Sequence, residues 1–253
     1  MFGRFRGWLT LVGIAATLAV LLPPVGPAVR QYVFMQALQF AVLATAVPAL
    51  VVLGAPCSRP RGRFAGRLAG RLATARSHRA GVTRAWATLI GFIVVAVAWR
   101  LPTSVNALVR YPALTIVEAA SLIVAGCALW LELVESPPFL PAIARPLRAA
   151  FAALPMWVIW ASAYIMAFSH TVWFIAFAHR TGQVLGIAAD QQIAAGLLWG
   201  ITGLCFVPVV YVSLITWLRD TSDPDHELRR VPQAGGAGGP HTPRPPRGWR
   251  LSR

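Results

Sequence analysis

The chain has 253 residues, of which 57% are hydrophobic and only 12% are charged. Ordinary soluble domains carry about 25% charged residues, so this composition excludes a soluble globular protein and indicates an integral membrane protein. All 23 basic residues are arginines, and they lie between the apolar segments. This distribution favours membrane orientation, rather than nucleic-acid binding, as the reason for the net charge of +15.

Six apolar segments approach the length of about 20 residues that a helix needs to cross a bilayer. Their apolar runs are continuous rather than alternating, so they predict helices and not the strands of a barrel. In chain order they span residues 8–25, 33–53, 85–101, 112–134, 149–169 and 191–218. The predicted fold class is therefore an all-α integral membrane protein, a bundle of about six transmembrane helices within residues 1–218.

The first segment has two interpretations. Arg4 and Arg6 precede a short apolar core, which is also the pattern of a secretory signal sequence. Pro23, Pro24 and Pro27 end the segment sharply, and no convincing Ala-x-Ala cleavage motif follows. We therefore expect a retained helix.

The arginines predict the orientation of the helices. If the N-terminus is cytoplasmic, 19 arginines lie on the cytoplasmic side. Only four lie on the other side, namely Arg30, Arg100, Arg110 and Arg180. Cytoplasmic loops of membrane proteins carry an excess of basic residues, so both termini are predicted to be cytoplasmic.

Two segments outside the predicted helices are strongly basic. The loop of residues 54–84 repeats arginine every four residues, at Arg63, Arg67 and Arg71. Such a stripe could lie on anionic lipid headgroups or touch a partner, although a solvated loop is the simpler interpretation. The tail of residues 219–253 is rich in Pro, Gly and Arg and lacks apolar periodicity, so we expect a disordered cytoplasmic tail.

No motif of a soluble enzyme occurs in the chain. We find no glycine-rich nucleotide loop, no His-Glu-x-x-His and no Gly-x-Ser-x-Gly. The three cysteines lie far apart without metal-binding or disulfide-type spacing. A non-enzymatic protein is therefore expected, without nucleic acid as a partner.

Several polar side chains fall at one level, the outer leaflet, once the predicted helices are oriented. Glu118 lies about 9 Å below the outer end of the fourth segment, at 1.5 Å per residue. The other members of this predicted polar cluster are Gln36, Gln39, Asp190, Gln191 and Gln192. A carboxylate within the bilayer is costly and is usually paired, and its candidate ion-pair partners are Arg100 and Arg110. A purely structural ion pair, or a protonated acid bonded to Ser or Thr, is the alternative to a functional role.

Asp190 opens the sixth segment. A carboxylate there can cap its own helix, a stabilisation of about 0.3–1 kcal/mol. The following small residues, Ala194, Ala195 and Gly196, allow a neighbouring helix to approach closely. We expect this neighbour to be the helix that carries Glu118.

Met166 and His170 are spaced four residues apart and face the same way on a helix. Thioether and imidazole groups are suitable ligands for Cu(I). Two ligands do not define a site, which Met35 or His179 could complete. A hydrogen-bonded surface histidine is the alternative.

Three segments, in the same order, resemble bacterial CtaG-type cytochrome c oxidase assembly factors. They are MQALQFAVLATAVPALVVLGAP (35–56), YPALTIVEAASLIVAGCALWLELVESPP (111–138) and DQQIAAGLLWG (190–200), followed by WLRD. The chain departs from the family at its histidine pairs, where it has Gln36 and Phe40, then Thr115 and Ala119, while Glu118 is retained.

The resemblance implies a membrane-embedded assembly or maturation factor for a respiratory cytochrome c oxidase in the bacterial plasma membrane. Its implied partners are oxidase subunits and the lipid bilayer, and its implied cargo is copper, which the absent histidines make less suited to this chain. Two alternatives remain open. In a small-solute or ion transporter Glu118 and the amides would line a pathway, although no internal repeat is visible. In a structural membrane subunit the polar cluster would only hold helices together.

Overall fold

The computed structural model describes residues 2–54, 81–136, 139, 141–169, 171–178 and 185–221. The basic stripe of the long loop, the tail beyond residue 221 and His170 lie outside these residues. The described part is built of helices and contains no strand, so the predicted all-α class is confirmed.

The helices follow one another with few residues between them. In chain order they are α1 (Phe2–Leu21), α2 (Val25–Ala28), α3 (Val33–Ala41), η1 (Val42–Ala46), α4 (Val47–Leu53), α6 (Gly81–Arg100), α7 (Pro102–Arg110), α8 (Leu114–Leu133), α9 (Arg145–Phe168), α10 (Ile175–Ala178) and α11 (Ile187–Thr221). The π-helix η1 joins α3 and α4 into one continuous rod, whose bounds are those of the second predicted segment.

Five of these spans are long and apolar enough to cross a membrane among the described residues. They are Val33–Leu53, Gly81–Arg100, Leu114–Leu133, Arg145–Phe168 and Ile187–Asp220. The described apolar part of α1, Gly7–Leu21, is shorter. The prediction of about six membrane helices agrees with this count.

Four helices begin earlier than the apolar pattern predicted. The predicted segments began at 8, 85, 149 and 191, whereas α1 begins at Phe2, α6 at Gly81, α9 at Arg145 and α11 at Ile187. Hydropathy locates only the apolar centre of a helix, whereas its first turn can carry arginine or aspartate at the membrane boundary.

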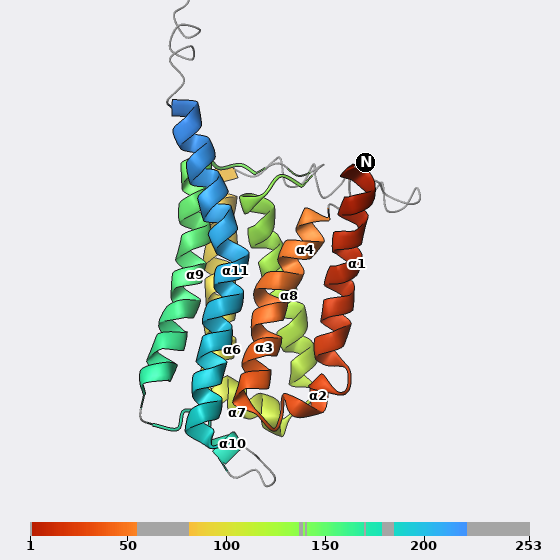
Figure 1. Cartoon of the computed structure of the whole chain (residues 1–253), viewed down its shortest axis with the longest axis vertical. Coiled ribbons are helices and arrows are strands. Elements are labelled where there is room, and N and C mark those ends of the chain that lie inside the picture. Colours follow the sequence, from red (N-terminus) through yellow and green to blue (C-terminus); the bar gives the residue numbers. More distant parts are fainter. Residues whose placement is uncertain are drawn as a thin grey trace, which may run out of the picture.

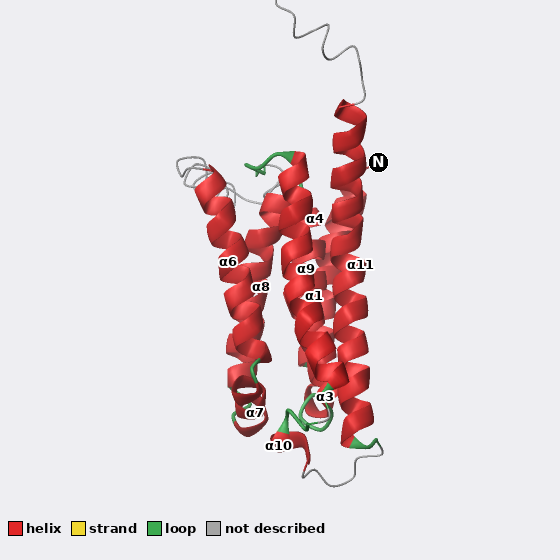
Figure 2. Cartoon of the chain, turned by 90° about the vertical axis from the view of Figure 1, so that its left-hand side faces the viewer, coloured by secondary structure: helices red, strands yellow, loops and turns green. Residues whose placement is uncertain are grey.

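The helices stand side by side as an upright bundle (Figures 1 and 2). α2, α7 and α10 lie at one end, called here the α7 end (Figure 1). The N-terminus and the last turns of α11 lie at the opposite end, the tail end. α11 has 35 residues, and at 1.5 Å per residue it is about 52 Å long, more than the ~30 Å hydrocarbon core of a bilayer. α11 is therefore longer than the hydrocarbon core, and its last turns rise above the other helices at the tail end (Figure 1).

The rod of α3, η1 and α4 is the centre of the bundle. Its most apolar window is 67% buried, against 22–39% for the other four spans. Because the rod occupies this position, α11 packs mainly along α9 and α3. We predicted that the last helix packs tightly against α8, the helix of Glu118; this is wrong, because its main partners are α9 and α3. α11 meets α8 nearer the tail end, where the rings of Trp130 and Phe206 stack at 5.4 Å.

A proline explains the π-helix in the rod. Pro48 has no N–H, so it cannot donate to the carbonyl of Ala44 one turn earlier, and its ring would collide with that carbonyl in a regular helix. The wider turn of η1 accommodates it. Gly126 of α8 lies against this site, where a Cβ atom would come within 2.4 Å of Pro48 Cγ and 2.8 Å of the Ala44 oxygen.

Replacing Gly126 with alanine should destabilise the bundle, because the added methyl group collides with a helix that cannot move freely. We expect a loss of about 1–3 kcal/mol in the free energy of unfolding, typical of overpacking. Circular dichroism of the detergent-purified protein under denaturant measures it. Gly91→Ala is the matched control, since a Cβ there meets nothing within 4 Å. Equal stability of the two variants would contradict this packing.

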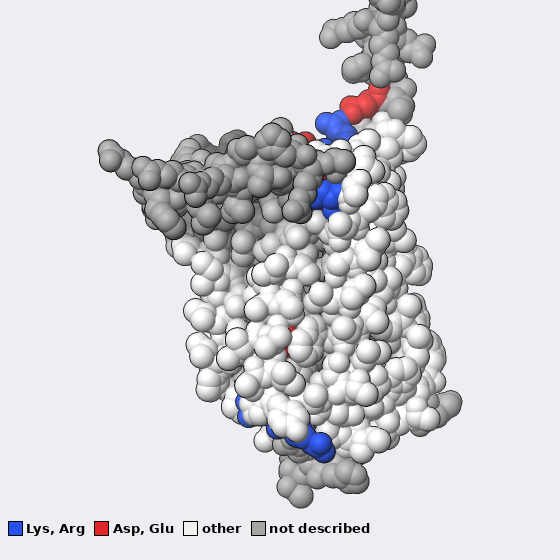
Figure 3. All heavy atoms as spheres, turned by 180° about the vertical axis from the view of Figure 1, so that it is seen from behind, with Lys and Arg blue, Asp and Glu red and all other residues white. Residues whose placement is uncertain are grey.

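The outer surface of the bundle is apolar. On the face shown in Figure 3, uncharged residues fill nearly all of the space between the two ends, where charged residues gather. Large exposed hydrophobic side chains occur on the long helices, including Ile90, Val94, Ile116, Val124, Trp157 and Leu204. Such a surface is unsuited to water, and together with the span lengths it defines a multi-pass membrane protein.

Candidate functional site

Buried polar side chains gather toward the α7 end of the bundle. They come from the first two turns of α3, α8 and α11, which run in one direction, and from the last residue of α6, which runs in the opposite direction. All are at most 9% exposed: Gln36, Gln39, Arg100, Glu118, Asp190 and Gln191. Polar groups inside an apolar bundle are costly unless they are paired, so their contacts define the site.

Gln36 bridges the two buried charges. Its side-chain oxygen accepts a hydrogen bond from Arg100 Nη1 at 2.6 Å, and its nitrogen donates to Glu118 Oε1 at 3.3 Å. Among the described residues no salt bridge reaches Glu118 directly. Arg100 and Glu118, the predicted partners, are therefore linked through the amide of Gln36 and not by a direct ion pair. We call these three side chains, which join α6, α3 and α8, the Arg100 network.

The guanidinium of Arg100 is enclosed by soft and aromatic groups. Its Nη2 lies 3.5 Å from the sulfur of Met166, and its carbon lies 5.4 Å and 5.5 Å from the ring centroids of Phe40 and Phe174. Cation–π contacts of this kind stabilise a desolvated guanidinium by about 2 kcal/mol. Arg100 is also the last residue of α6, where the helix dipole favours a positive charge.

Asp190 caps a helix other than its own. α11 begins at Ile187, so Asp190 lies within its first turn. Its two carboxylate oxygens accept hydrogen bonds from the backbone N–H groups of Val33 and Phe34, each at 2.8 Å. These are the first two residues of α3, whose preceding residue Tyr32 supplies no side-chain cap. The sequence predicted a cap of its own helix; the structure corrects this to a cap across the α11–α3 contact.

Gln191 and Gln192 have different environments. Gln191 is buried and donates to the backbone oxygen of Met166 at 2.8 Å, while its own oxygen accepts from the N–H of Trp173 at 3.4 Å. It therefore fastens the loop after α9 to α11. Gln192 is exposed, beside Trp199 in the groove between α9 and α11.

Two further predicted residues lie around the Arg100 network. Gln39 donates to the carbonyl of Val20 in α1 at 2.9 Å, so it joins α3 to α1. Arg110 is exposed at the end of α7. It forms no ion pair with Glu118 in the described part of the chain.

The contacts of Met166 do not favour copper. Its sulfur faces the Arg100 guanidinium, and a positive neighbour at 3.5 Å repels a metal cation. Its proposed partner His170 lies outside the described residues. Within those residues no group of three or more His, Cys, Asp or Glu side chains could hold a metal ion.

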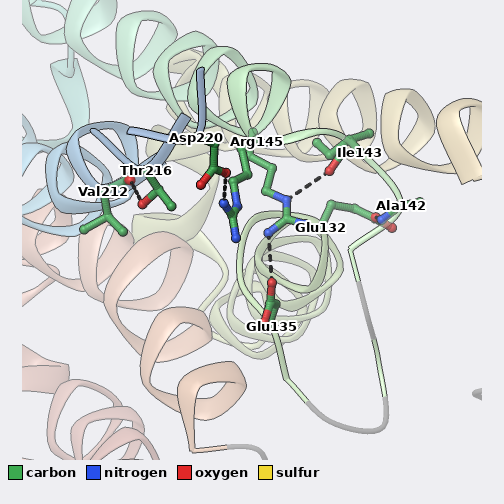
Figure 4. A network of polar contacts seen from close by, with 9 residues as sticks. Glu132, Glu135, Ala142, Ile143, Arg145, Val212, Thr216 and Asp220 are labelled. Carbon is green, nitrogen blue, oxygen red and sulfur yellow. Dashed lines mark hydrogen bonds and ion pairs between the residues drawn. The ribbon is translucent and has the colours of Figure 1, made fainter. Parts of the chain in front are cut away.

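A second polar network lies at the tail end of the bundle (Figure 4). Glu132 is fully buried and accepts a hydrogen bond from Arg84 Nε at 2.8 Å, which ties α8 to α6. Arg148 reaches Glu135 at 3.4 Å, and Arg145 pairs with Asp220 of α11. Exposed pairs contribute little, so Glu132 is the main anchor at this end.

Sequence reasoning missed several contacts of the site. Residue spacing does not predict the pairing of Arg84 with Glu132 or the contact of Arg100 with Phe174. Nor does it predict that Asn106 accepts a hydrogen bond from the N–H of Ala176 at 3.1 Å. The sequence does contain a signal for α7. The segment Pro102–Arg110 begins with proline and places its polar and apolar residues on opposite faces, which is the pattern of an amphipathic helix.

The fold and the site together define a multi-pass helical membrane protein whose described residues include a buried charged network near one end. The sequence matches the family of cytochrome c oxidase caa3 assembly factors over residues 3–220. The chain belongs to this family. No curated protein and no solved structure matches it.

Proposed function

We propose that this protein acts in the bacterial plasma membrane as a non-enzymatic maturation factor for a respiratory cytochrome c oxidase. Family membership supports the oxidase context. The excess of arginine in the loop and tail supports an orientation with both termini in the cytoplasm and the α7 end outside.

The Arg100 network is the observation that carries the proposed role. A passive anchor could pack its helices with apolar residues alone, whereas this bundle holds two buried ionisable groups of opposite sign between α6, α3 and α8. Polar groups in such positions usually mark functional sites of membrane proteins. In the proposed orientation the network lies in the outer leaflet, with Gln39, Asp190 and Gln191 around it.

The partner is an oxidase subunit that contacts the α7 end during assembly. The network and the Asp190 cap fix the ends of α3, α6 and α8 relative to one another, so that the α7 end presents a fixed surface. Exposed Arg30 and Arg110 give this surface positive charge, which favours a partner segment with acidic or phosphate-bearing groups.

Deletion of the gene tests the proposal. We expect a several-fold loss of cytochrome c oxidase activity in isolated membranes, restored by the wild-type gene on a plasmid. Haem a content and oxidase-bound copper should fall together with activity, because the factor acts before the enzyme is complete. Unchanged activity and copper content in the deletion strain would refute the proposed role.

A further inference from the structure

A cavity of about 200 Å³ lies beside the Arg100 network, between α1, α2, α3, α7 and α8. Its polar wall consists of Gln36, Gln39, Thr115 and Glu118, and the remainder is mostly aliphatic. Arg30, which is exposed, stands at its rim. The cavity thus reaches from the level of the buried carboxylate to the surface at the α7 end.

Two oxygen atoms in this wall lack hydrogen-bond partners within the described part of the chain. They are Glu118 Oε2 and Gln39 Oε1, and each side chain is only 1% exposed. The other polar atom of each side chain already forms a hydrogen bond. Glu118 Oε1 accepts from Gln36, and the amide nitrogen of Gln39 donates to Val20 of α1. The side chains that line the cavity therefore include two acceptors for which the described residues supply no donor.

Buried acceptors require a donor or a cation. Arg100 attracts Glu118 through space but donates no hydrogen bond to it, so the second carboxylate oxygen remains available to a cation in the cavity. Carboxylate, amide and hydroxyl oxygens are the ligands of hard cations, and none of the described residues that line the cavity carries a sulfur or an imidazole. One carboxylate with Arg30 at the rim suits a single positive charge better than two.

We propose that this cavity binds a small monovalent cation, of the class of Na⁺, K⁺ or ammonium. Glu118 Oε2 and Gln39 Oε1 are its ligands, and Thr115, which lines the same wall, offers its hydroxyl as a third oxygen. This assignment differs from the copper that the family resemblance implies, because the cavity offers only oxygen donors. The main competitor is a proton held by Glu118, which would satisfy the carboxylate without any use of the cavity.

Thermal unfolding of the purified full-length protein in detergent tests the cation site. Tryptophan fluorescence is recorded in chloride salts of Na⁺, K⁺, ammonium or N-methylglucamine at one ionic strength, and in the N-methylglucamine salt with added Mg²⁺, Ca²⁺ or Cu(I). We expect one of the small cations to raise Tm by several degrees and to saturate, with no such rise in N-methylglucamine. Glu118→Gln should abolish the rise, and Gln39→Leu should raise the half-saturating concentration at least tenfold. Gln192→Leu, an exposed amide that does not line the cavity, should leave the titration unchanged.

Three results would overturn the cation site. The first is a Tm that is equal in all salts, with Glu118→Gln as stable as the wild type or more so, which would indicate a protonated carboxyl group. The second is a saturable rise caused by Mg²⁺, Ca²⁺ or Cu(I) alone. The third is a monovalent titration unaffected by Gln39→Leu. The measurement uses no oxidase, so its outcome is independent of the deletion experiment.

Discussion

Replacing Arg100 with methionine should lower the free energy of unfolding by about 3–5 kcal/mol, the usual cost of removing one member of a buried charge pair. The methionine side chain fits among Phe40, Phe174 and Met166, so the loss comes from electrostatics rather than from a cavity. It leaves Gln36 without its donor and Glu118 without the only buried positive charge near it in the described structure. Denaturant titration of the detergent-purified protein, followed by circular dichroism, measures the change.

The double variant Arg100→Met with Glu118→Gln separates charge from packing. Because it removes both charges, it should recover most of the lost stability, and the coupling between the two sites should exceed about 1 kcal/mol. Arg110→Met is the matched control: this arginine is exposed at the end of α7, and its loss should change stability by no more than about 0.5 kcal/mol. An Arg100→Met protein as stable as the Arg110→Met protein would contradict the buried network.

Replacing Asp190 with leucine should destabilise the protein by about 2–3 kcal/mol, because two backbone N–H groups at the start of α3 lose a charged acceptor. Leucine has the branched shape of aspartate, although it is larger, and it accepts no hydrogen bond. Asp190→Asn keeps one acceptor oxygen, so it should lose roughly half as much.

Hydrogen exchange locates this effect. In Asp190→Leu we expect faster amide exchange at Val33 and Phe34, while the exchange at the start of α8 stays as in the wild type. Mass spectrometry of peptides that cover each helix start resolves the two regions. A loss of protection at the start of α11 with none at α3 would restore the simpler interpretation that Asp190 caps its own helix.

Both variants act on the start of α3, which is the central helix of the bundle. Arg100 and Glu118 meet at Gln36, and Asp190 holds the two residues that open the helix. α3 is therefore the element through which α6, α8 and α11 are fixed together at the α7 end.

The sequence predicted the helical fold well because long apolar runs have few other solutions in a bilayer. It located the second span at 33–53 with the bounds that the structure has, and the other spans to within a few residues. It missed the π-helix at Val42–Ala46, because the response of the chain to Pro48 depends on the room that Gly126 leaves beside it.

The polar residues of the site could be selected from the sequence, but their contacts could not. The depth of a residue along a membrane helix follows from its number, so the sequence predicts that Gln36, Glu118 and Asp190 lie at the same depth in the bilayer. Rotation and helix order do not follow from it. For this reason Asp190 was assigned to its own helix rather than to α3, and the bridging position of Gln36 between Arg100 and Glu118 was not foreseen.

The most direct test of the proposed role is oxidase activity in a deletion strain that carries Gln36→Leu. This change removes the bridge between Arg100 and Glu118 while it keeps both charges. Gln192→Leu, an exposed amide on α11, is the control, and immunoblots of the membranes establish that both variants are present at wild-type amounts. We expect Gln36→Leu to restore less than a tenth of the wild-type oxidase activity and Gln192→Leu to restore all of it. Full activity with Gln36→Leu at normal abundance would contradict a functional role for the Arg100 network.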